Sequence, residues 1–276
     1  MTYRELYDTG KRTLAREGIR EADLDARLLL EFVCHTGRND LLAHGERPVS
    51  REQTARYLSL IQARGAHRPL QYLTGEQSFM GLSFLVTPDV LIPRQDTEIL
   101  TEEVLKNLHD GFRILDLCTG SGCILLSLLH YSNGCTGVGT DLSAKALDVA
   151  RQNALALQEP NAAFLQSDLF EKVEGQFEII VSNPPYIRSD VIGTLMEEVR
   201  LHEPLMALDG GSDGLSFYRR IVKESRRHLC GGGQLFLEIG YDQREAVTAL
   251  LREAGFRNVT AIPDYAGLDR VVYGEY

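Results

Sequence analysis

The sequence lacks the features that define several protein classes. Its five cysteines are odd in number, scattered and never spaced C-x-x-C, which argues against a disulfide framework and against a zinc or iron–sulfur centre. Aspartate and glutamate (39) outnumber lysine and arginine (29), so the net charge of -10 provides no general attraction for nucleic acid. No apolar run approaches the ~18 residues that span a bilayer, and the N-terminal residues carry acidic side chains without the apolar stretch of a secretory signal. We therefore expect a soluble cytoplasmic protein with no metal and no membrane partner.

The composition is that of a folded globular protein. The chain has 276 residues, of which 43% are hydrophobic and 25% charged. This length corresponds to about two domains at roughly 150 residues each. No internal repeat or low-complexity segment is present.

The periodicity of apolar residues changes along the chain and predicts three regions. Residues 1–73 show only helical spacing, and Ser50 with Gln53 forms a capping box before a helix that ends at Gly65. Residues 74–92 alternate with a period of two around Met80-Gly81, which predicts a β-hairpin linker. From residue 93 to 276 strands and helices alternate, which predicts a second, larger domain.

This larger domain is predicted to be of the α/β class. Seven strands are expected, at residues 112–117, 136–140, 162–166, 177–182, 234–239, 259–263 and 270–273. They should build one mostly parallel sheet covered by helices on both faces. The last two are separated by a loop too short for a helical crossover, so the final strand should run antiparallel. The expected architecture is a Rossmann-like, seven-stranded domain preceded by a small all-helical domain and a hairpin.

A glycine-containing turn at the end of the first strand of this domain is a candidate nucleotide site. The turn comprises Cys118, Thr119, Gly120, Ser121 and Gly122 and leads directly into an apolar helix. Asp141 ends the next strand roughly 20 residues later, where an acid can accept hydrogen bonds from ribose hydroxyls. Asp168, after the third strand, is either an acceptor for an adenine amino group or a turn residue.

The form of this turn indicates which ligand is bound. The G-x-G-x-x-G spacing of dinucleotide folds is absent, because the turn reads C-T-G-S-G and its glycines stop early. A nucleoside ligand without phosphates is therefore favoured. S-adenosyl-L-methionine carries ribose, adenine, an amino-acid tail and a sulfonium, and it fits these requirements.

The fourth strand ends in Asn183-Pro184-Pro185-Tyr186, which is the candidate catalytic motif. Two prolines remove two backbone donors and hold the preceding residues extended, so Asn183 is rigid at the ligand-binding edge of the sheet. The Asn183 side-chain oxygen and the Pro184 carbonyl can each accept one N–H of a planar NH2 group and turn its nitrogen toward a methyl donor. Tyr186 is expected to stack on the flat group. A rigid turn without function is the alternative interpretation.

Further segments resemble the peptide chain release factor glutamine methyltransferase family, also called HemK-like. They are Leu91–Glu98, Glu203-Pro204, Ala207-Leu208, Gly210–Leu215, Leu237–Gly240 and Gly267–Val272. The resemblance implies methyl transfer from S-adenosyl-L-methionine, with S-adenosyl-L-homocysteine as product, to the glutamine of a Gly-Gly-Gln loop in a release factor. By this resemblance, residues 118–122, Asp141, Asp168, Leu169 and Asn183 contact the cofactor, and residues 183–186 contact the substrate. It also implies that the helical domain recognises the release factor.

The sequence departs from the family pattern at three places. Cys118 stands where the family usually has glycine, and we expect it to have a negative φ and to pack rather than react. Gln95-Asp96 replaces the usual proline and acid, which leaves the roles of Arg94 and Glu98 open: Arg94 either meets the substrate or pairs with a carboxylate. Leu169 replaces a frequent aromatic residue, so plain apolar contact with adenine is expected there.

Two alternatives are weighed against this function. An adenine-N6 methyltransferase of DNA or RNA would use the same Asn183–Tyr186 motif, but the acidic chain has no lysine- or arginine-rich run. A non-catalytic binding module would carry damage in the glycine turn or in the motif, and only Cys118 hints at it. We expect an active enzyme that is a monomer and binds no nucleic acid directly.

Overall fold

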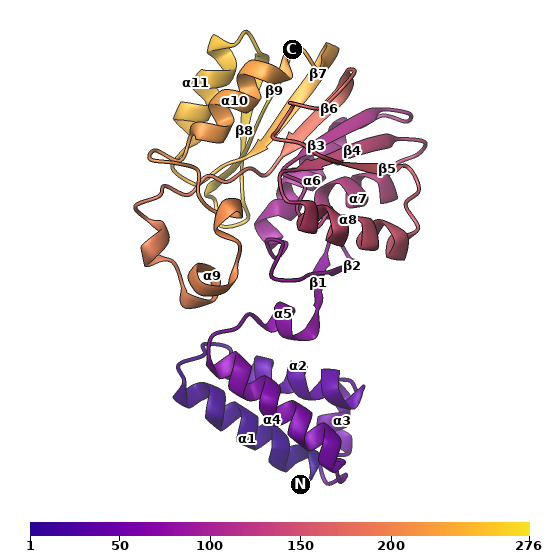
Figure 1. Cartoon of the computed structure of the whole chain (residues 1–276), viewed down its shortest axis with the longest axis vertical. Helices are drawn as coiled ribbons and strands as arrows, with labels where there is room; N and C mark the ends of the chain where they lie inside the picture. Colours follow the sequence, from indigo (N-terminus) through magenta and orange to yellow (C-terminus); the bar gives the residue numbers. More distant parts are fainter. The chain divides into compact units, whose positions relative to one another are not determined.

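The computed structural model describes residues 1–276, and the chain divides into two compact units. The first comprises Met1–Glu76 together with Met196–His202, and the second comprises Gln77–Leu195 together with Glu203–Tyr276. None of the helices combines the length and the apolar character needed to cross a membrane. The first unit is built of helices, and the second contains the sheet (Figure 1).

The first unit is built on three long helices and three short ones. They are α1 (Tyr3–Arg16), α2 (Ala22–Cys34), α3 (Arg38–Ala43), α4 (Arg51–Gly65), α5 (Leu70–Thr74) and α9 (Glu197–His202). The capping box predicted for α4 is present: Ser50 Oγ accepts from the Gln53 N–H at 3.1 Å, and Gln53 Oε1 accepts from the Ser50 N–H. The bundle core includes Leu6, Leu29 and Tyr57, all fully buried.

Two features of this unit were not foreseen from the sequence. Helices α3 and α5 have six and five residues, too few to show a helical period. Helix α9 belongs to the first unit although it lies far along the chain. The buried Arg64 of α4 explains this, because its guanidinium contacts Asp25 at 2.7 Å and Glu198 of α9 at 2.6 Å.

The predicted β-hairpin follows the helical bundle. It consists of β1 (Glu76–Phe79) and β2 (Leu82–Leu85), joined by Met80 and Gly81. Both turn residues have positive φ, 51° and 74°, as a two-residue type I′ turn requires. Phe79 and Phe84 are fully buried and pack edge to face, which fixes the hairpin on the core of the second unit.

A seven-stranded sheet with the order β5-β4-β3-β6-β7-β9-β8 forms the centre of the second unit. Its strands are β3 (Arg113–Leu117), β4 (Thr136–Asp141), β5 (Ala162–Gln166), β6 (Phe177–Ser182), β7 (Leu229–Glu238), β8 (Arg257–Pro263) and β9 (Asp269–Glu275). β9 runs antiparallel to both β7 and β8, and the other neighbouring pairs are parallel. The predicted fold class and the antiparallel last strand are confirmed.

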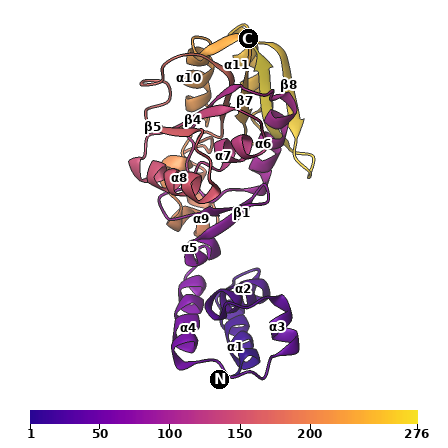
Figure 2. The same cartoon turned by 90° about the vertical axis from the view of Figure 1, so that its right-hand side faces the viewer.

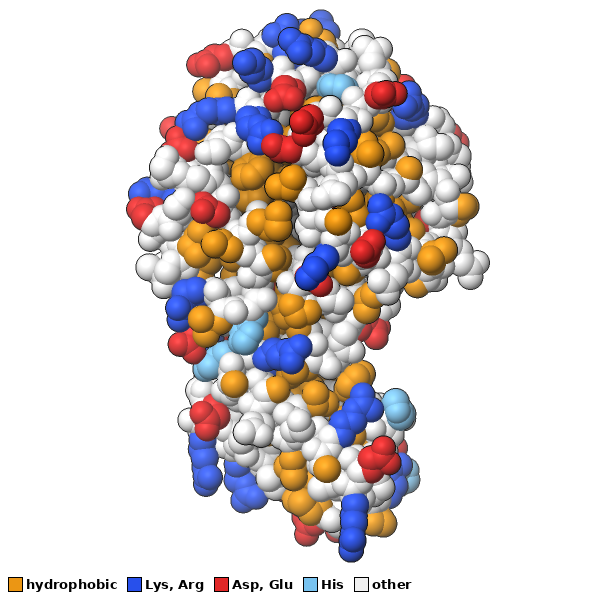
Figure 3. All heavy atoms as spheres, in the orientation of Figure 1, with side chains coloured by type: hydrophobic (Ala, Val, Ile, Leu, Met, Phe, Trp, Pro, Cys, Tyr) orange, Lys and Arg blue, Asp and Glu red, His pale blue; other side chains and the backbone are white.

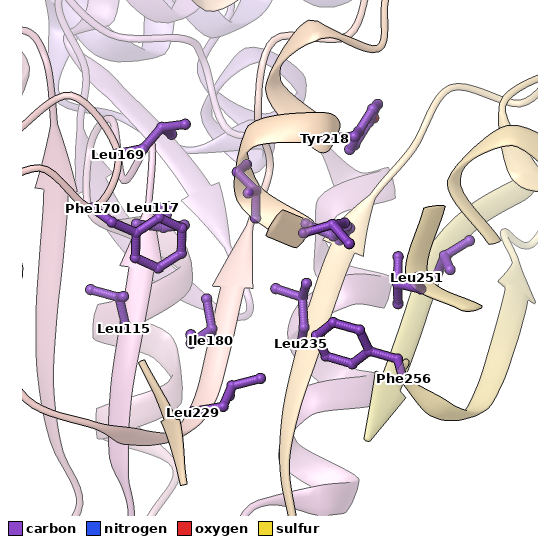
Figure 4. Close-up of a cluster of buried hydrophobic side chains, with 14 of the residues drawn as sticks. Leu115, Leu117, Leu169, Phe170, Ile180, Tyr218, Leu229, Leu235, Leu251 and Phe256 are labelled. Carbon is purple, nitrogen blue, oxygen red and sulfur yellow. The ribbon is translucent and has the colours of Figure 1, made fainter. Parts of the chain in front are cut away.

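Helices cover both faces of the sheet (Figures 1 and 2). They are α6 (Gln95–Asn107), α7 (Cys123–His130), α8 (Ala144–Leu157), α10 (Ser216–Ser225) and α11 (Arg244–Glu253), with short helical segments at Ile192–Thr194 and Leu205–Ala207. Neighbouring residues of a strand point to opposite faces: Ile114 packs with α6 and α7, whereas Leu115 packs with α10 and α11. Figure 4 shows the second of these clusters, with Leu115, Ile180 and Leu235 in adjacent strands.

The strand order determines where a ligand can bind. The chain builds outward from β3 to β4 and β5, then returns to place β6 on the other side of β3. The connections on either side of this switch point leave the sheet in opposite directions, so a crevice opens at the carboxyl ends of β3 and β6. Cys118 and Asn183 follow these two strand ends.

Candidate active site

A cavity lies at the carboxyl edge of the sheet, at this switch point. It measures about 950 Å³ including its part open to solvent. Its lining comes from the segments after β3, β4, β5 and β6, from residues 89–91 and 204–209, and from α10. The lining residues are Asp89, Val90, Leu91, Cys118, Gly120, Asp141, Leu142, Ser143, Ala146, Ser167, Asp168, Leu169, Asn183, Pro185, Pro204, Met206, Ala207, Asp209 and Phe217. Four carboxylates and no lysine or arginine line it.

The turn after β3 brings its backbone to the cavity. Cys118 and Gly120 line the cavity, whereas Thr119, Ser121 and Gly122 lie behind them, with Thr119 donating to Asp116 Oδ2 at 2.6 Å. A Cβ on Gly120 would meet no atom within 4 Å, so steric room does not require glycine here. The backbone φ of 55° does favour glycine, because other residues rarely adopt it.

The expected negative φ of Cys118 is wrong. Its φ is 59°, in the left-handed region that glycine adopts without strain. The chain therefore keeps the backbone conformation of the family's glycine while carrying a side chain. Burial raises the pKa of the Cys118 thiol far above its usual range, so the thiol is protonated at neutral pH and packs in the core.

Asp141 at the end of β4 holds the turn in place. Its Oδ2 accepts from the Gly120 N–H at 3.0 Å, and its Oδ1 accepts from the Ser143 N–H at 2.9 Å. Burial raises the pKa of this carboxyl, and the backbone donors oppose that effect. Asp141 lines the cavity, and each of its carboxylate oxygens keeps a lone pair that can accept from a diol such as ribose. Ser143 caps α8 by accepting from the Ala146 N–H at 3.2 Å.

Asp168, Leu169 and Phe217 line another part of the same cavity. Asp168 forms an ion pair with Arg220 of α10 at 2.9 Å and is half-exposed. Leu169 is buried and has a positive φ of 51°. Phe217, which also belongs to α10, places an aromatic ring in the cavity lining, whereas Leu169 places an aliphatic side chain there.

Asn183 of the Asn-Pro-Pro-Tyr motif lines the cavity, and its side chain is held from behind. Its Nδ2 donates to Thr97 Oγ1 of α6 at 3.2 Å. The Oδ1 atom is therefore the end of the amide that remains available to a ligand. Pro185 lines the cavity too, while Pro184 is buried outside its lining.

Tyr186 packs against the core and is not part of the cavity lining. Its ring packs against the hydrophobic cluster of Figure 4, and its hydroxyl donates to Glu238 Oε1 at 3.2 Å. Glu238 ends β7 and is only 1% exposed. Burial raises the pKa of Glu238 to about 7, against the opposing effects of the Thr97 hydroxyl, Arg270 and the Tyr186 hydroxyl.

A glycine-rich loop packs directly on the backbone of the motif. The Ile187 N–H donates to the Leu208 carbonyl at 3.0 Å, and the Gly210 N–H donates to the Ile187 carbonyl at 2.8 Å. Gln243 links both segments, because its Nε2 donates to the carbonyls of Tyr186 and Gly214. Residues 210–214 therefore support the motif from outside the cavity lining.

The two open positions of the Leu91–Glu98 segment have partners in the structure. Arg94 forms an ion pair with Glu203, whose side chain is almost fully buried. Burial raises the pKa of Glu203, and the Arg94 charge opposes that effect. Glu98 accepts from the Met80 N–H at 2.6 Å and so joins α6 to the hairpin. Of the two alternatives for Arg94, the structure contains the carboxylate pair.

Several residues around the site had no role assigned from the sequence. Thr97 and Glu238 lie inside segments that carry the family resemblance, but nothing local predicts that they approach Asn183 and Tyr186. Gln243 and Phe217 gave no signal, because each lies in an ordinary amphipathic helical region. A buried carboxylate at the end of a predicted central strand, as at Glu238, is the one signal that could have been noticed.

The fold and the site together define a Rossmann-like methyltransferase. Residues 5–75 match the PrmC N-terminal domain family, and residues 94–200 match the Methyltransferase small domain family. The fold is similar to that of a methyltransferase from Pyrococcus furiosus, with a TM-score of 0.55 at 19% identity over 82% of this chain and 98% of that one.

Comparison with the sequences of known proteins identifies the family. The chain is 41% identical over 270 residues to a release factor glutamine methyltransferase from Agrobacterium fabrum, covering 95% of this chain and 93% of that protein. It is 44% identical over 275 residues to the protein of the same name from Moorella thermoacetica, covering 98% and 97%. The chain belongs to the release factor glutamine methyltransferase family, and the resemblance seen in its motifs is confirmed.

Proposed function

We propose that this enzyme transfers a methyl group from S-adenosyl-L-methionine to the side-chain amide N5 of the glutamine in the Gly-Gly-Gln motif of peptide chain release factors. The observation that carries the proposal is the placement of Asn183: it follows a central strand, lines the cavity, and has its amide nitrogen bound to Thr97 so that its oxygen is free. The names of the relatives supply the substrate class.

The chemistry of the cavity supports S-adenosyl-L-methionine as the methyl donor. Asp141 can accept from the ribose hydroxyls, and Asp168 is placed as a second acceptor. Leu169 and Phe217 provide apolar surface for the adenine ring. The cavity is lined by four carboxylates and by no lysine or arginine. This charge suits a ligand that carries a positive sulfonium and no phosphate. We assign Cys118, Gly120, Asp141, Asp168, Leu169 and Asn183 to cofactor contact, with Thr119, Ser121 and Gly122 shaping the turn behind them.

In this proposal the motif binds and orients the substrate amide. Asn183 Oδ1 and the Pro184 carbonyl each accept one N–H of the glutamine, which directs its nitrogen and stabilises the positive charge that develops there. When bound, S-adenosyl-L-methionine would supply an electrophilic methyl carbon, with its sulfur as the leaving group that keeps the electron pair. The glutamine nitrogen forms the new bond to carbon and loses one proton to water. No general base is needed, because the alkylated amide nitrogen is strongly acidic.

The proposed role of Tyr186 changes with its position. The sequence suggested that it stacks on the substrate, whereas its ring packs in the core and its hydroxyl binds Glu238. We therefore propose that Asn183, Pro184 and Pro185 contact the substrate and that Tyr186 holds the motif from behind.

The partner assignments belong to the same proposal. The helical unit of residues 1–76 is proposed to recognise the release factor, and the enzyme to act in the cytoplasm as a monomer. On the face shown in Figure 3, lysine and arginine side chains are interspersed with aspartate and glutamate and form no continuous stripe. This distribution supports a protein substrate over DNA or RNA.

Mass spectrometry of a release factor incubated with the enzyme and S-adenosyl-L-methionine tests the proposal. We expect a gain of one methyl group on the Gly-Gly-Gln glutamine, its loss in Asn183→Ala, and its persistence in Asn133→Ala, an asparagine in the turn before β4. A release factor whose motif glutamine is changed to alanine should gain nothing. Cofactor binding without transfer to the release factor would overturn the assignment and direct the search to adenine substrates.

A further inference from the structure

A chain of polar side chains runs from Asn183 into the core of the second unit. Asn183 Nδ2 donates to Thr97 Oγ1 at 3.2 Å, and Thr97 is only 3% exposed. Tyr186 donates to Glu238 Oε1 at 3.2 Å, whereas Oε2 of this buried carboxylate has no hydrogen-bond partner. The Thr97 hydroxyl is near enough to lower the pKa of Glu238, so it is the donor placed to bind Oε2. Three separate elements, α6, the loop after β6 and the end of β7, therefore meet behind the catalytic motif.

The orientation of the Asn183 amide decides whether the proposed chemistry can occur. A side-chain amide has an acceptor end and a donor end of nearly the same shape. Only the oxygen end can accept an N–H of the substrate. With the NH2 end turned to the cavity, two donors would face each other and the substrate nitrogen would lose its positioning.

The partner of Thr97 determines which end faces the cavity. A threonine hydroxyl has one proton to donate and lone pairs to accept with. If the proton is directed to the Glu238 carboxylate, the oxygen is left to accept from Asn183 Nδ2. Without that carboxylate, Thr97 is equally able to donate to Asn183 Oδ1, which would turn the NH2 end toward the cavity.

We propose that Thr97 and Glu238 are positioning residues: Glu238 takes the hydroxyl proton of Thr97, and Thr97 in turn binds the Asn183 NH2 group and keeps its oxygen directed at the substrate amide. This inference rests on the proposed function of Asn183 and extends it to two residues that touch neither substrate nor cofactor. Tyr186 is the second donor that keeps the Glu238 carboxylate in place.

The charged and titratable groups around Glu238 predict a pH dependence. They are Thr97 and Asp96 on α6, Tyr186 after β6, and Arg270 on β9, with Tyr218 of α10 donating to the Glu238 backbone carbonyl at 2.9 Å. Arg270 itself contacts Asp264 and Asp96. Since burial raises the pKa of Glu238 to about 7, the arrangement requires its ionised form and is lost as the pH falls through that value.

Three substitutions on α6 test the role of Thr97. Thr97→Val keeps the shape of the side chain but removes the hydroxyl, and we expect kcat to fall roughly ten- to a hundred-fold with cofactor affinity unchanged. Thr97→Ser should restore kcat to within about threefold of the original. Thr101→Val is the matched control, because Thr101 is also fully buried, one turn further along, and donates only to the Thr97 carbonyl. An unchanged kcat in Thr97→Val would overturn the proposal.

The pH profile of Glu238→Gln separates positioning from mere packing. For the original enzyme we expect kcat to rise with pH through about 7 as Glu238 ionises. The variant should lose this rise and have a lower kcat at pH 8. A rise of the same shape and height in Glu238→Gln would contradict the assignment.

A readout without turnover distinguishes failure of this inference from failure of the proposed function. The side-chain NH2 signals of Asn183 in a ¹H–¹⁵N NMR spectrum are identified by their loss in Asn183→Asp. Thr97→Val should shift them and Thr101→Val should not. If they shift although no release factor is methylated, the hydrogen-bond chain stands and the substrate assignment falls. If they do not shift, the hydrogen-bond chain is wrong whatever the substrate.

Discussion

Gly210 and Tyr186 approach each other so closely that a Cβ on Gly210 would lie 2.7 Å from the Tyr186 Cα atom. Gly210→Ala should therefore displace the Asn183–Tyr186 segment, lower kcat at least tenfold and reduce the free energy of unfolding by roughly 1–3 kcal/mol. Initial rates of methyl transfer and urea denaturation measure the two effects. Gly193→Ala is the control, since a Cβ there meets nothing within 4 Å. Equal behaviour of the two variants would show that the close approach is unimportant.

Asp141 connects the turn after β3 to the start of α8 through two backbone N–H groups. Asp141→Ala leaves both donors without this acceptor, so we expect the free energy of unfolding to fall by about 1–3 kcal/mol. We also expect S-adenosyl-L-methionine affinity to fall at least tenfold, measured by calorimetry. Asp148→Ala, an exposed acid on α8 that pairs with Arg151, should change neither quantity appreciably. Full cofactor affinity in Asp141→Ala would exclude Asp141 as a ribose ligand.

Asp116 is fully buried beneath the turn, and burial raises its pKa to about 7. The folded protein therefore binds this proton more tightly than the unfolded chain, whose carboxyl titrates near 3.8. Stability contributed by the protonated form is present at low pH and is lost as the pH rises through about 7.

In Asp116→Asn the side chain at this position cannot ionise, so the variant does not lose this stability at high pH. The free energy of unfolding of the variant minus that of the original protein should therefore increase by roughly 2–3 kcal/mol from pH 5 to pH 8, since one pKa unit corresponds to about 1.4 kcal/mol. Denaturation curves across this range provide the measurement. Glu238 titrates near the same pH in both proteins, and its effect cancels in the difference. A difference that does not vary with pH would show that the Asp116 carboxyl keeps an ordinary pKa.

Cys118 occupies a backbone conformation with φ 59° that costs a non-glycine residue about 1 kcal/mol. Cys118→Gly relieves this strain but adds a comparable entropy to the unfolded chain, so its stability should stay within about 1 kcal/mol. Cys118→Val places a β-branched side chain at the same φ and should destabilise by about 2 kcal/mol or more. Thermal or urea unfolding of the pair measures this. Equal stability of both variants would contradict the left-handed conformation.

Much of the fold follows from local patterns in the sequence. The α4 capping box and the Met80-Gly81 turn arise from interactions within a few residues. The seven strands are marked by local apolar patterns, although their pairing joins distant segments. Short elements such as α3 had no such signal, because six residues do not complete two helical turns.

The sequence by itself determined which residues reach the ligand-binding edge. Asn183 follows a strand and precedes two prolines, and Asp141 ends the neighbouring strand, so their positions depend only on strand ends and on the parallel order of the sheet. Thr97 behind Asn183, Glu238 behind Tyr186, and Glu198 against Arg64 were decided only by the tertiary structure. These partners lie tens of residues apart in the chain, and side-chain contacts at such separations depend on how whole elements pack, which no local periodicity encodes.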